Sequence, residues 1–236
     1  MGNFLSRFFQ EPQQERKFTN IKDNKYHFDA IMELAYKMSC RNPAHLPKLV
    51  KLLARKIQSN ALCAALYYDT KEEIDNNVPE IKPGHLLFDF SIKLNNEDNE
   101  FNDFMVKLEY HRPLELRTDI IMPWPWQRQD IIVNLCDIPV GGWRQDINHI
   151  VEYWLPIGVG FVNCGNHSIM CGIINGEGVI SDYSALDISE TYKHVKCDGK
   201  HYMRTSDYSI ISEVSNLEFA AIYEIGRLMV EHGVCA

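Results

Sequence analysis

The sequence predicts a mixed α+β protein with a helical pair first, a mixed sheet with helices in the centre, and a helix at the C-terminal end. Three observations predict this class. Apolar residues recur at helical spacing near both ends of the chain. Short strand-forming runs, separated by turn residues, fill the second half. Of the 236 residues, 45% are apolar and 11% aromatic, which is ample for a buried core.

The first 25 residues are predicted to form a flexible arm, because residues 10–25 are mostly polar and charged. Residues 1–6 (MGNFLS) also fit the pattern for N-myristoylation at Gly2. Apolar side chains in residues 4–9 leave a small amphipathic docking segment as the alternative.

Residues 26–112 are predicted to form a mainly helical region. Apolar residues at helical spacing predict helices over residues 26–40 and 47–67. A turn-rich, acidic stretch predicts a loop over residues 69–84, followed by a strand over 85–92. An acidic connector then leads into a short helix over residues 101–110.

Residues 113–236 are predicted to form the α/β core, continuous with the helical region in one globular unit. Strands are expected at residues 120–122, 149–155 and 158–162, and a helix at 129–138. Asp198-Gly199 predicts a hairpin between strands at 194–197 and 200–203. Ser215 and Glu218 form the sequence pattern of a capping box, which predicts the start of the final helix.

Composition excludes several classes of function. The net charge is −8, so no overall positive field attracts a nucleic-acid backbone, and non-specific nucleic-acid binding is not expected. Seven cysteines without a CxxC pair indicate reduced thiols and a cytoplasmic protein. No apolar run approaches the roughly 18 residues of a transmembrane helix.

The stretch FVNCGNHSIMCGIINGEG, residues 161–178, is the strongest candidate for a ligand site. A strand runs into Gly165 and Asn166, which tolerate the backbone geometry of a sharp turn into a helix. The first turn of a helix has unpaired N–H groups and a positive dipole end, so it attracts anions. The alternative is a turn without a ligand, in which Asn166 only caps the helix.

A polar cluster precedes this loop. Residues 143–149 (WRQDINH) place five hydrogen-bonding or titratable side chains within seven positions, which a simple surface turn does not require. These side chains raise the expectation of a ligand site. They are Arg144, Gln145, Asp146, Asn148 and His149.

The segment from Pro123 to Ile180 resembles the ParB/sulfiredoxin-like nucleotide-binding fold. The matching pieces are a proline-rich approach with Gln127-Arg128, a short helix, a polar turn, two strands, and Gly165-Asn166-His167-Ser168 opening a helix. The resemblance implies that this last loop holds the phosphates of CTP or ATP. Ser168 departs from the family, because many relatives have an arginine there. The phosphate-pairing guanidinium would then come from Arg144 or Arg128.

A wider resemblance covers most of the C-terminal half. The segments WRQDINH, GNHSI and LEFAAIYEIGRL are similar to members of an uncharacterised bacterial domain family. This resemblance implies a bacterial or phage-associated origin, with a defence or mobile-element context, and supplies no activity.

We therefore expect a nucleotide or another phosphorylated ligand at the loop from Gly165 to Ser168, in a nucleotide-dependent enzyme or switch. Mg²⁺ accompanying a nucleoside triphosphate is the expected cofactor, and no residue is assigned as a dedicated metal ligand. The residues expected to act in catalysis are Asp146, His149, His167 and Glu177. Those expected to bind the ligand are Arg128, Arg144, Gln145, Asn148, Gly165, Asn166 and Ser168.

Three alternatives remain open at this stage. A non-catalytic subunit of a bacterial complex would use Trp124, Trp126 and Trp143 as binding anchors. A metal-dependent nuclease or hydrolase would use His149, His167 and Asp146. A thiol enzyme would use Cys164 near His167. The ligand, the reaction and the oligomeric state are not predicted.

Overall fold

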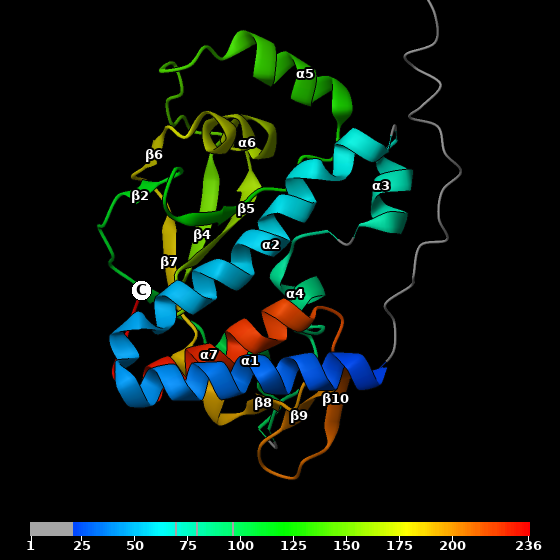
Figure 1. Ribbon diagram of the computed structural model, residues 1–236, viewed down its shortest axis with the longest axis vertical. Helices are drawn as coiled ribbons and strands as arrows, with labels where there is room; N and C mark the ends of the chain where they lie inside the picture. Colours follow the sequence, from blue (N-terminus) through cyan, green and yellow to red (C-terminus); the bar gives the residue numbers. More distant parts are fainter. Residues whose placement is uncertain (1–20, 69, 79, 96) are drawn as a thin grey trace, which may run out of the picture.

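The structure is a computed structural model that describes residues 21–236 apart from residues 69, 79 and 96 (Figure 1). The described part has a mixed α+β fold, as the sequence predicts. Its helices are α1 (Ile21–Arg41), α2 (Leu46–Tyr67), α3 (Lys71–Asn77), α4 (Pro83–Leu86), α5 (Arg128–Asp137), α6 (Asn166–Asn175) and α7 (Leu217–Glu231), with 3₁₀ turns η2 (Pro43–His45), η3 (Phe101–Phe104) and η4 (Ser189–Lys193). Its strands are β1 (Val106–Leu108), β2 (Leu114–Glu115), β3 (Ile120–Met122), β4 (Ile150–Leu155), β5 (Val159–Cys164), β6 (Val179–Ile180), β7 (Ser184–Asp187), β8 (Val195–Cys197), β9 (His201–Arg204) and β10 (Ile210–Glu213).

The main sheet has five strands in the order β1-β7-β4-β5-β3. It is mixed, because β4 pairs with β7 and β3 with β5 in parallel, whereas β1–β7 and β4–β5 are antiparallel. The β4–β5 hairpin turns at a cis Leu155–Pro156 peptide. A three-stranded sheet, β10-β9-β8, and a two-stranded ribbon, β2-β6, complete the described part.

Alternation along β4 divides the core between the two faces of the main sheet, since successive side chains point to opposite faces. Trp154 joins Phe161 in the larger hydrophobic cluster, which also holds residues of α1, α2 and α7. Val151 and Tyr153 join a smaller cluster with Trp143 and other residues of the β2-β6 side.

Helix α7 belongs to the larger cluster, and α1 and α2 both pack against it (Figure 1). Its residues from Phe219 to Gly226 are all buried. A helix that is buried almost all round requires partners on several sides. Those partners are α1, α2, the main sheet through the Phe161–Phe219 ring contact, and the three-stranded sheet through Tyr202–Tyr223.

Several predicted elements are confirmed. They are both N-terminal helices, the strand at 120–122, the helix after residue 127, the pair of strands joined at Pro156, the helix after Gly165 and the final helix. The hairpin at Asp198-Gly199 is also present, although Cys197 pairs with Tyr202, which places Gly199 and Lys200 at its tip. Residues 1–20 of the predicted arm, which include the Gly2 motif, lie outside the described residues. The last five residues of the predicted arm, 21–25, belong to α1.

The region between α2 and β2 differs from the prediction. The expected loop at 69–84 contains α3, which begins with a capping box between Thr70 and Glu73. The expected strand at 85–92 is wrong, because Pro83 starts the short helix α4 and no strand follows in this stretch. The expected helix at 101–110 is also wrong beyond η3, since residues 106–108 pair with β7 as β1.

The cap of α7 lies one residue later than predicted. The side chain of Asn216 accepts a hydrogen bond from the Phe219 amide, so Asn216 is the N-cap. The Ser215 hydroxyl instead donates to the carbonyl oxygen of His85 at 2.9 Å. This bond joins the start of α7 to α4.

The seven cysteines all lie in the described part, and none of them forms a disulfide. Among the described helices, none is both long and apolar enough to cross a bilayer.

Candidate functional site

The β5–α6 junction turns the chain sharply at Gly165, whose φ of +87° lies in the left-handed region. A Cβ atom there would lie 2.6 Å from His149 Cδ2 and 3.0 Å from the Asn148 carbonyl oxygen. Glycine is therefore required both by the backbone conformation and by the close approach of residues 148–149.

Helix α6 starts without a side-chain cap and has no acidic residue in its first turn. The amide groups of Asn166, His167 and Ser168 have no acceptor within the described part of the chain. The alternative that Asn166 caps the helix is wrong, because its Oδ1 accepts from the Trp124 amide at 2.6 Å. The first turn of α6 therefore carries unpaired amides of the kind that favour an anion.

His167 is held against the start of α5. Its Nε2 accepts a hydrogen bond from the Gln127 amide at 3.2 Å, and its Nδ1 lies 3.7 Å from Asp130 Oδ2. Burial lowers the pKa of His167, and the Asp130 carboxylate opposes this effect. Because Nε2 accepts, the neutral ring carries its proton on Nδ1.

His149 is buried on the other side of the junction. Its Nδ1 accepts from the Asp146 amide at 2.8 Å, so the neutral ring carries its proton on Nε2. Its ring contacts Trp143 with centroids 4.9 Å apart. Burial lowers the pKa of His149, and the Asp146 carboxylate, 3.1 Å from Nδ1, acts in the opposite direction.

Gln145 and Glu177 each join two loops. The Gln145 side chain accepts from the amides of Ser181 and Asp182 and donates to the Asp182 carbonyl oxygen. The Glu177 carboxylate accepts from the Gly141 amide and from Asn175 Nδ2. Both side chains are therefore used in fixing the segments around α6.

Asp146 and Arg144 are the exposed charged groups of the polar segment. One Asp146 oxygen accepts from the Asn148 amide at 2.8 Å, which closes a local turn. Arg144 Nη1 donates to main-chain oxygens near it in sequence, those of Gly141 and Trp143. Much of each charged group therefore faces solvent.

The structure brings residues 143–149 against one side of the β5–α6 junction, and Arg128 lies at the start of α5 on the other side. His149 packs on Gly165, and Trp143 Nε1 donates to the Ser168 carbonyl oxygen at 2.8 Å. Arg128 instead donates to the Leu66 carbonyl oxygen at the end of α2. Of the two candidate phosphate-pairing arginines, Arg144 lies in the segment that contacts Gly165 and Ser168, and Arg128 follows Gln127, whose amide donates to His167.

The metal and thiol alternatives gain no support from the geometry. Within the described ranges, no group of three His, Cys, Asp or Glu side chains could hold a metal ion, so His149, His167 and Asp146 do not form such a group. Cys164 is exposed at the end of β5. The His167 ring, its expected partner, bonds to the Gln127 amide instead.

The tryptophans expected to anchor a partner belong mainly to the interior. Trp124 and Trp143 are 4% and 2% exposed, and Trp126 is half-buried beside His167. Packing rather than partner binding therefore accounts for Trp124 and Trp143. Exposed apolar side chains are spread over several described elements, and those of α5 are Ile132, Val133 and Leu135.

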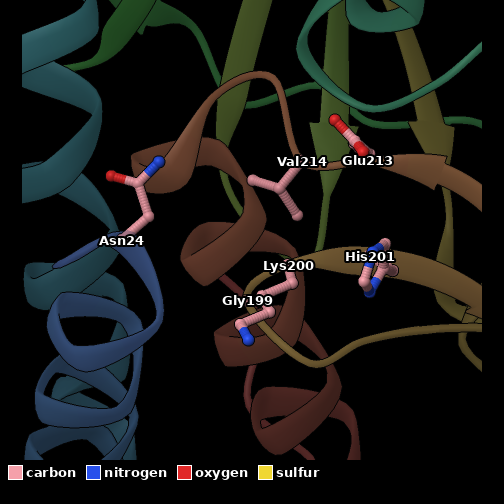
Figure 2. A pocket seen from close by; sticks show the side chains of 6 residues that line it. All are labelled: Asn24, Gly199, Lys200, His201, Glu213 and Val214. Carbon is pink, nitrogen blue, oxygen red and sulfur yellow. The ribbon is translucent and has the colours of Figure 1, made fainter. Parts of the chain in front are cut away.

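The 198–201 hairpin borders a separate recess of about 80 Å³. Figure 2 shows its lining, where Gly199, Lys200 and His201 lie near Asn24 of α1 and Glu213 of β10. The three-stranded sheet and α6 lie at opposite ends of the molecule (Figure 1). The hairpin therefore does not border the β5–α6 junction.

The family profile described as a family of unknown function (DUF6710) matches residues 6–235. The chain belongs to the DUF6710 family. The resemblance to an uncharacterised domain family is confirmed at this level. No curated protein matches the chain. No solved structure matches it either, so the ParB/sulfiredoxin-like resemblance of this DUF6710 member stays a prediction.

Sequence reasoning missed one set of polar residues in this DUF6710 member. Glu152 and Asn163 stand in the otherwise apolar strands β4 and β5, and both line a cleft of about 610 Å³ on the main sheet. A charged or amide side chain within an apolar strand is the signal that could have found them.

Proposed function

We propose that this DUF6710 member binds a nucleotide or another phosphorylated small molecule at the first turn of α6. The observation that supports this proposal is the set of three adjacent amides, at Asn166, His167 and Ser168, that have no acceptor in the described part of the chain. Unpaired amides and the positive end of the helix dipole both favour a phosphate group.

The surrounding groups support binding more directly than catalysis. The side chains of His149, His167 and Glu177 each accept a hydrogen bond from a main-chain amide. Their expected role is therefore to position the loops around α6. Arg144 keeps an exposed guanidinium in the segment that contacts the junction, and it would neutralise the phosphate.

We expect Mg²⁺ to bind at this site only together with a phosphate ligand. Asp146 has one exposed carboxylate, and one of its oxygens already accepts from the Asn148 amide. Mg²⁺ is commonly held by one or two carboxylates together with phosphate oxygens and water, so Asp146 would supply one ligand.

Ser168→Asp tests the proposal, because it places a carboxylate in the first turn of α6. We expect the substitution to leave the fold intact, since a negative charge at a helix N-terminus is favourable by about 0.3–1 kcal/mol. We expect it to weaken binding of ATP, CTP or GTP about tenfold or more through repulsion. Calorimetric titrations with and without Mg²⁺ measure the affinity, and Ser206→Asp, an exposed serine between β9 and β10, is the matched control.

Two results would contradict the proposal. One is the absence of heat with all three nucleotides and with inorganic phosphate. The other is equal affinity in the wild type and in Ser168→Asp. The first result would leave the second candidate function, a non-catalytic interaction subunit, as the better account. That role is favoured by the exposed apolar side chains of α5, with Ile132 49% and Val133 44% exposed.

A further inference from the structure

A cleft of about 610 Å³ opens on the face of the main sheet that carries Trp154. Its volume lies within the roughly 300–1,000 Å³ range of small-molecule sites. The proposal at α6 uses none of the residues that line it.

Strand register builds the floor of the cleft. Lys107 of β1 pairs with Leu186 of β7, and Leu186 pairs with Trp154 of β4, so these three side chains form a row across the sheet. Glu152 lies two residues before Trp154 and therefore on the same face. The cleft floor thus carries a cationic group on β1 and an anionic group on β4.

Aromatic rings form the apolar part of the lining. Phe90 and Trp154 both line the cleft, with ring centroids 6.2 Å apart and planes 26° from parallel. Phe90 also stacks on the buried Phe101 at 4.3 Å. This packing behind the rings makes the apolar surface rigid enough to hold a flat or apolar group.

The turn that contains α4 supplies two further nitrogen groups, Lys82 and His85. Lys82 Nζ lies 2.8 Å from Glu80 Oε1, and His85 Nδ1 lies 3.8 Å from Glu80 Oε2. Glu80 therefore offsets part of this positive charge, and Lys107 is the cation of the lining without an anionic partner in the part of the chain that the structure describes.

Four polar side chains of the lining have no partner among the described residues. Glu152, Lys107, Asn102 and Asn163 form no side-chain hydrogen bond and no ion pair with any described residue. Trp154 is 1% exposed, and its Nε1 has no acceptor within the described residues. Buried polar groups normally have a partner, so the unpaired indole N–H of this cleft residue indicates a missing one. The side chains of Asn102, Lys107 and Asn163 are exposed and therefore available to a ligand.

Lys107 and Glu152 do not neutralise each other. They stand on strands separated by β7 and are offset by two residues along the sheet, which places their Cα atoms about 12 Å apart from strand spacing and rise. A ligand between them would meet a cation at one side and a carboxylate at the other.

We propose that the cleft binds a small amphoteric molecule with an apolar or aromatic body, the chemistry of an aromatic amino acid. Its acidic group pairs with Lys107, and its amino group pairs with Glu152. The ring lies against Phe90, which stacks on the buried Trp154, and the amides of Asn102 and Asn163 supply further hydrogen bonds.

Calorimetric titration of the full chain with L-tryptophan and L-phenylalanine tests this assignment. We expect a Kd of about 1 mM or lower for at least one of them. Tryptamine, which lacks the carboxylate, and indole-3-propionate, which lacks the amine, should each bind about tenfold more weakly. Glu152→Gln and Lys107→Met should weaken binding of the amino acid by a similar factor. Glu97→Gln and Lys51→Met change exposed side chains away from the cleft and should leave it unchanged.

The indole N–H resonance of Trp154 supplies a second readout, which should shift on binding. The assignment is overturned if neither amino acid binds, if Glu152→Gln binds as tightly as the wild type, or if AMP alone shifts the Trp154 resonance. Ser168→Asp should leave amino-acid binding unchanged, which separates failure at the cleft from failure at α6.

Discussion

At the scale of single residues, the two sides of the β5–α6 junction depend on neutral histidines. His149 accepts from the Asp146 amide, and His167 accepts from the Gln127 amide. Protonation would remove each acceptor and place a charge in a buried position. The histidines that looked catalytic in the sequence are thus tied to the main chain around the loop.

The stability of the protein should decrease as the pH falls below about 6.5, the ordinary histidine pKa. Burial lowers the pKa of both His149 and His167 in the folded state. The unfolded chain therefore binds protons first, and the stability present above the unfolded pKa is lost as the pH falls through the folded pKa. Urea unfolding between pH 7.5 and 5.0 measures this slope.

His149→Asn provides the check on that assignment. The variant should show a shallower loss of stability over the same pH range, because one depressed histidine has been removed. An unchanged slope in this variant and in His167→Asn would mean that other groups cause the pH dependence.

At the scale of elements, local sequence signals predicted those helices and strands whose burial pattern is regular. Helices α1 and α2 follow their apolar spacing, and β4 and β5 follow apolar runs that flank Pro156. The secondary structure of residues 70–108 was harder to predict, because a capping box at Thr70 and a proline at 83 start short helices in a polar context. The three-residue strand β1 exists only through its pairing with β7.

The ion pair between Glu224 and Arg227 lies within α7, and both side chains also bond to the main chain of β8 or η4. The Glu224 carboxylate accepts from the Cys197 amide at 2.7 Å and from Arg227 Nε at 2.7 Å. Arg227 also donates to the carbonyl oxygens of Tyr192 and Val195. Breaking one partner of such a network leaves the other charge unpaired in a buried position.

Glu224→Ala should therefore lower the free energy of unfolding by about 3 kcal/mol. Glu218→Ala, on the same helix, removes a partner of the exposed Lys56 and should cost less than about 1 kcal/mol. Chemical denaturation of both variants measures the difference. Equal losses would show that the Glu224–Arg227 pair contributes no more than a surface pair.

At the scale of the whole molecule, one hydrophobic cluster runs from Phe28 in α1 to Met229 in α7. The boundary predicted at residue 112 passes through this cluster, because α1 and α2 lie on one side of it and α7 on the other. The two regions therefore share their core, which favours the prediction of one continuous globular unit.

A fragment of residues 113–236 should fail to fold by itself. Without α1 and α2, it would expose apolar faces of α7 that the full chain buries. Circular dichroism and thermal unfolding of the fragment should show no cooperative transition, and co-expression with residues 1–112 should restore one. A cooperative transition in the isolated fragment would make residues 113–236 an independent domain.

The sequence by itself determined the mixed α+β class, the helices at both ends, the β4–β5 pair and the glycine turn into α6. These features depend on residues within about one or two turns of one another, so local spacing is sufficient. The sequence also predicted that residues 143–149 and 165–168 belong to one site. The close approach of His149 to Gly165 agrees with this prediction.

Only the tertiary structure decided what each polar side chain contacts. Gln145 bonds to Ser181, Glu177 bonds to Gly141, and His167 bonds to Gln127, each across 36 or 40 residues of sequence. The cleft combines Lys107, Trp154 and Asn163 from three strands, together with the turn at α4. Which groups are paired and which are left open depends on strand order and packing, and local sequence does not encode either.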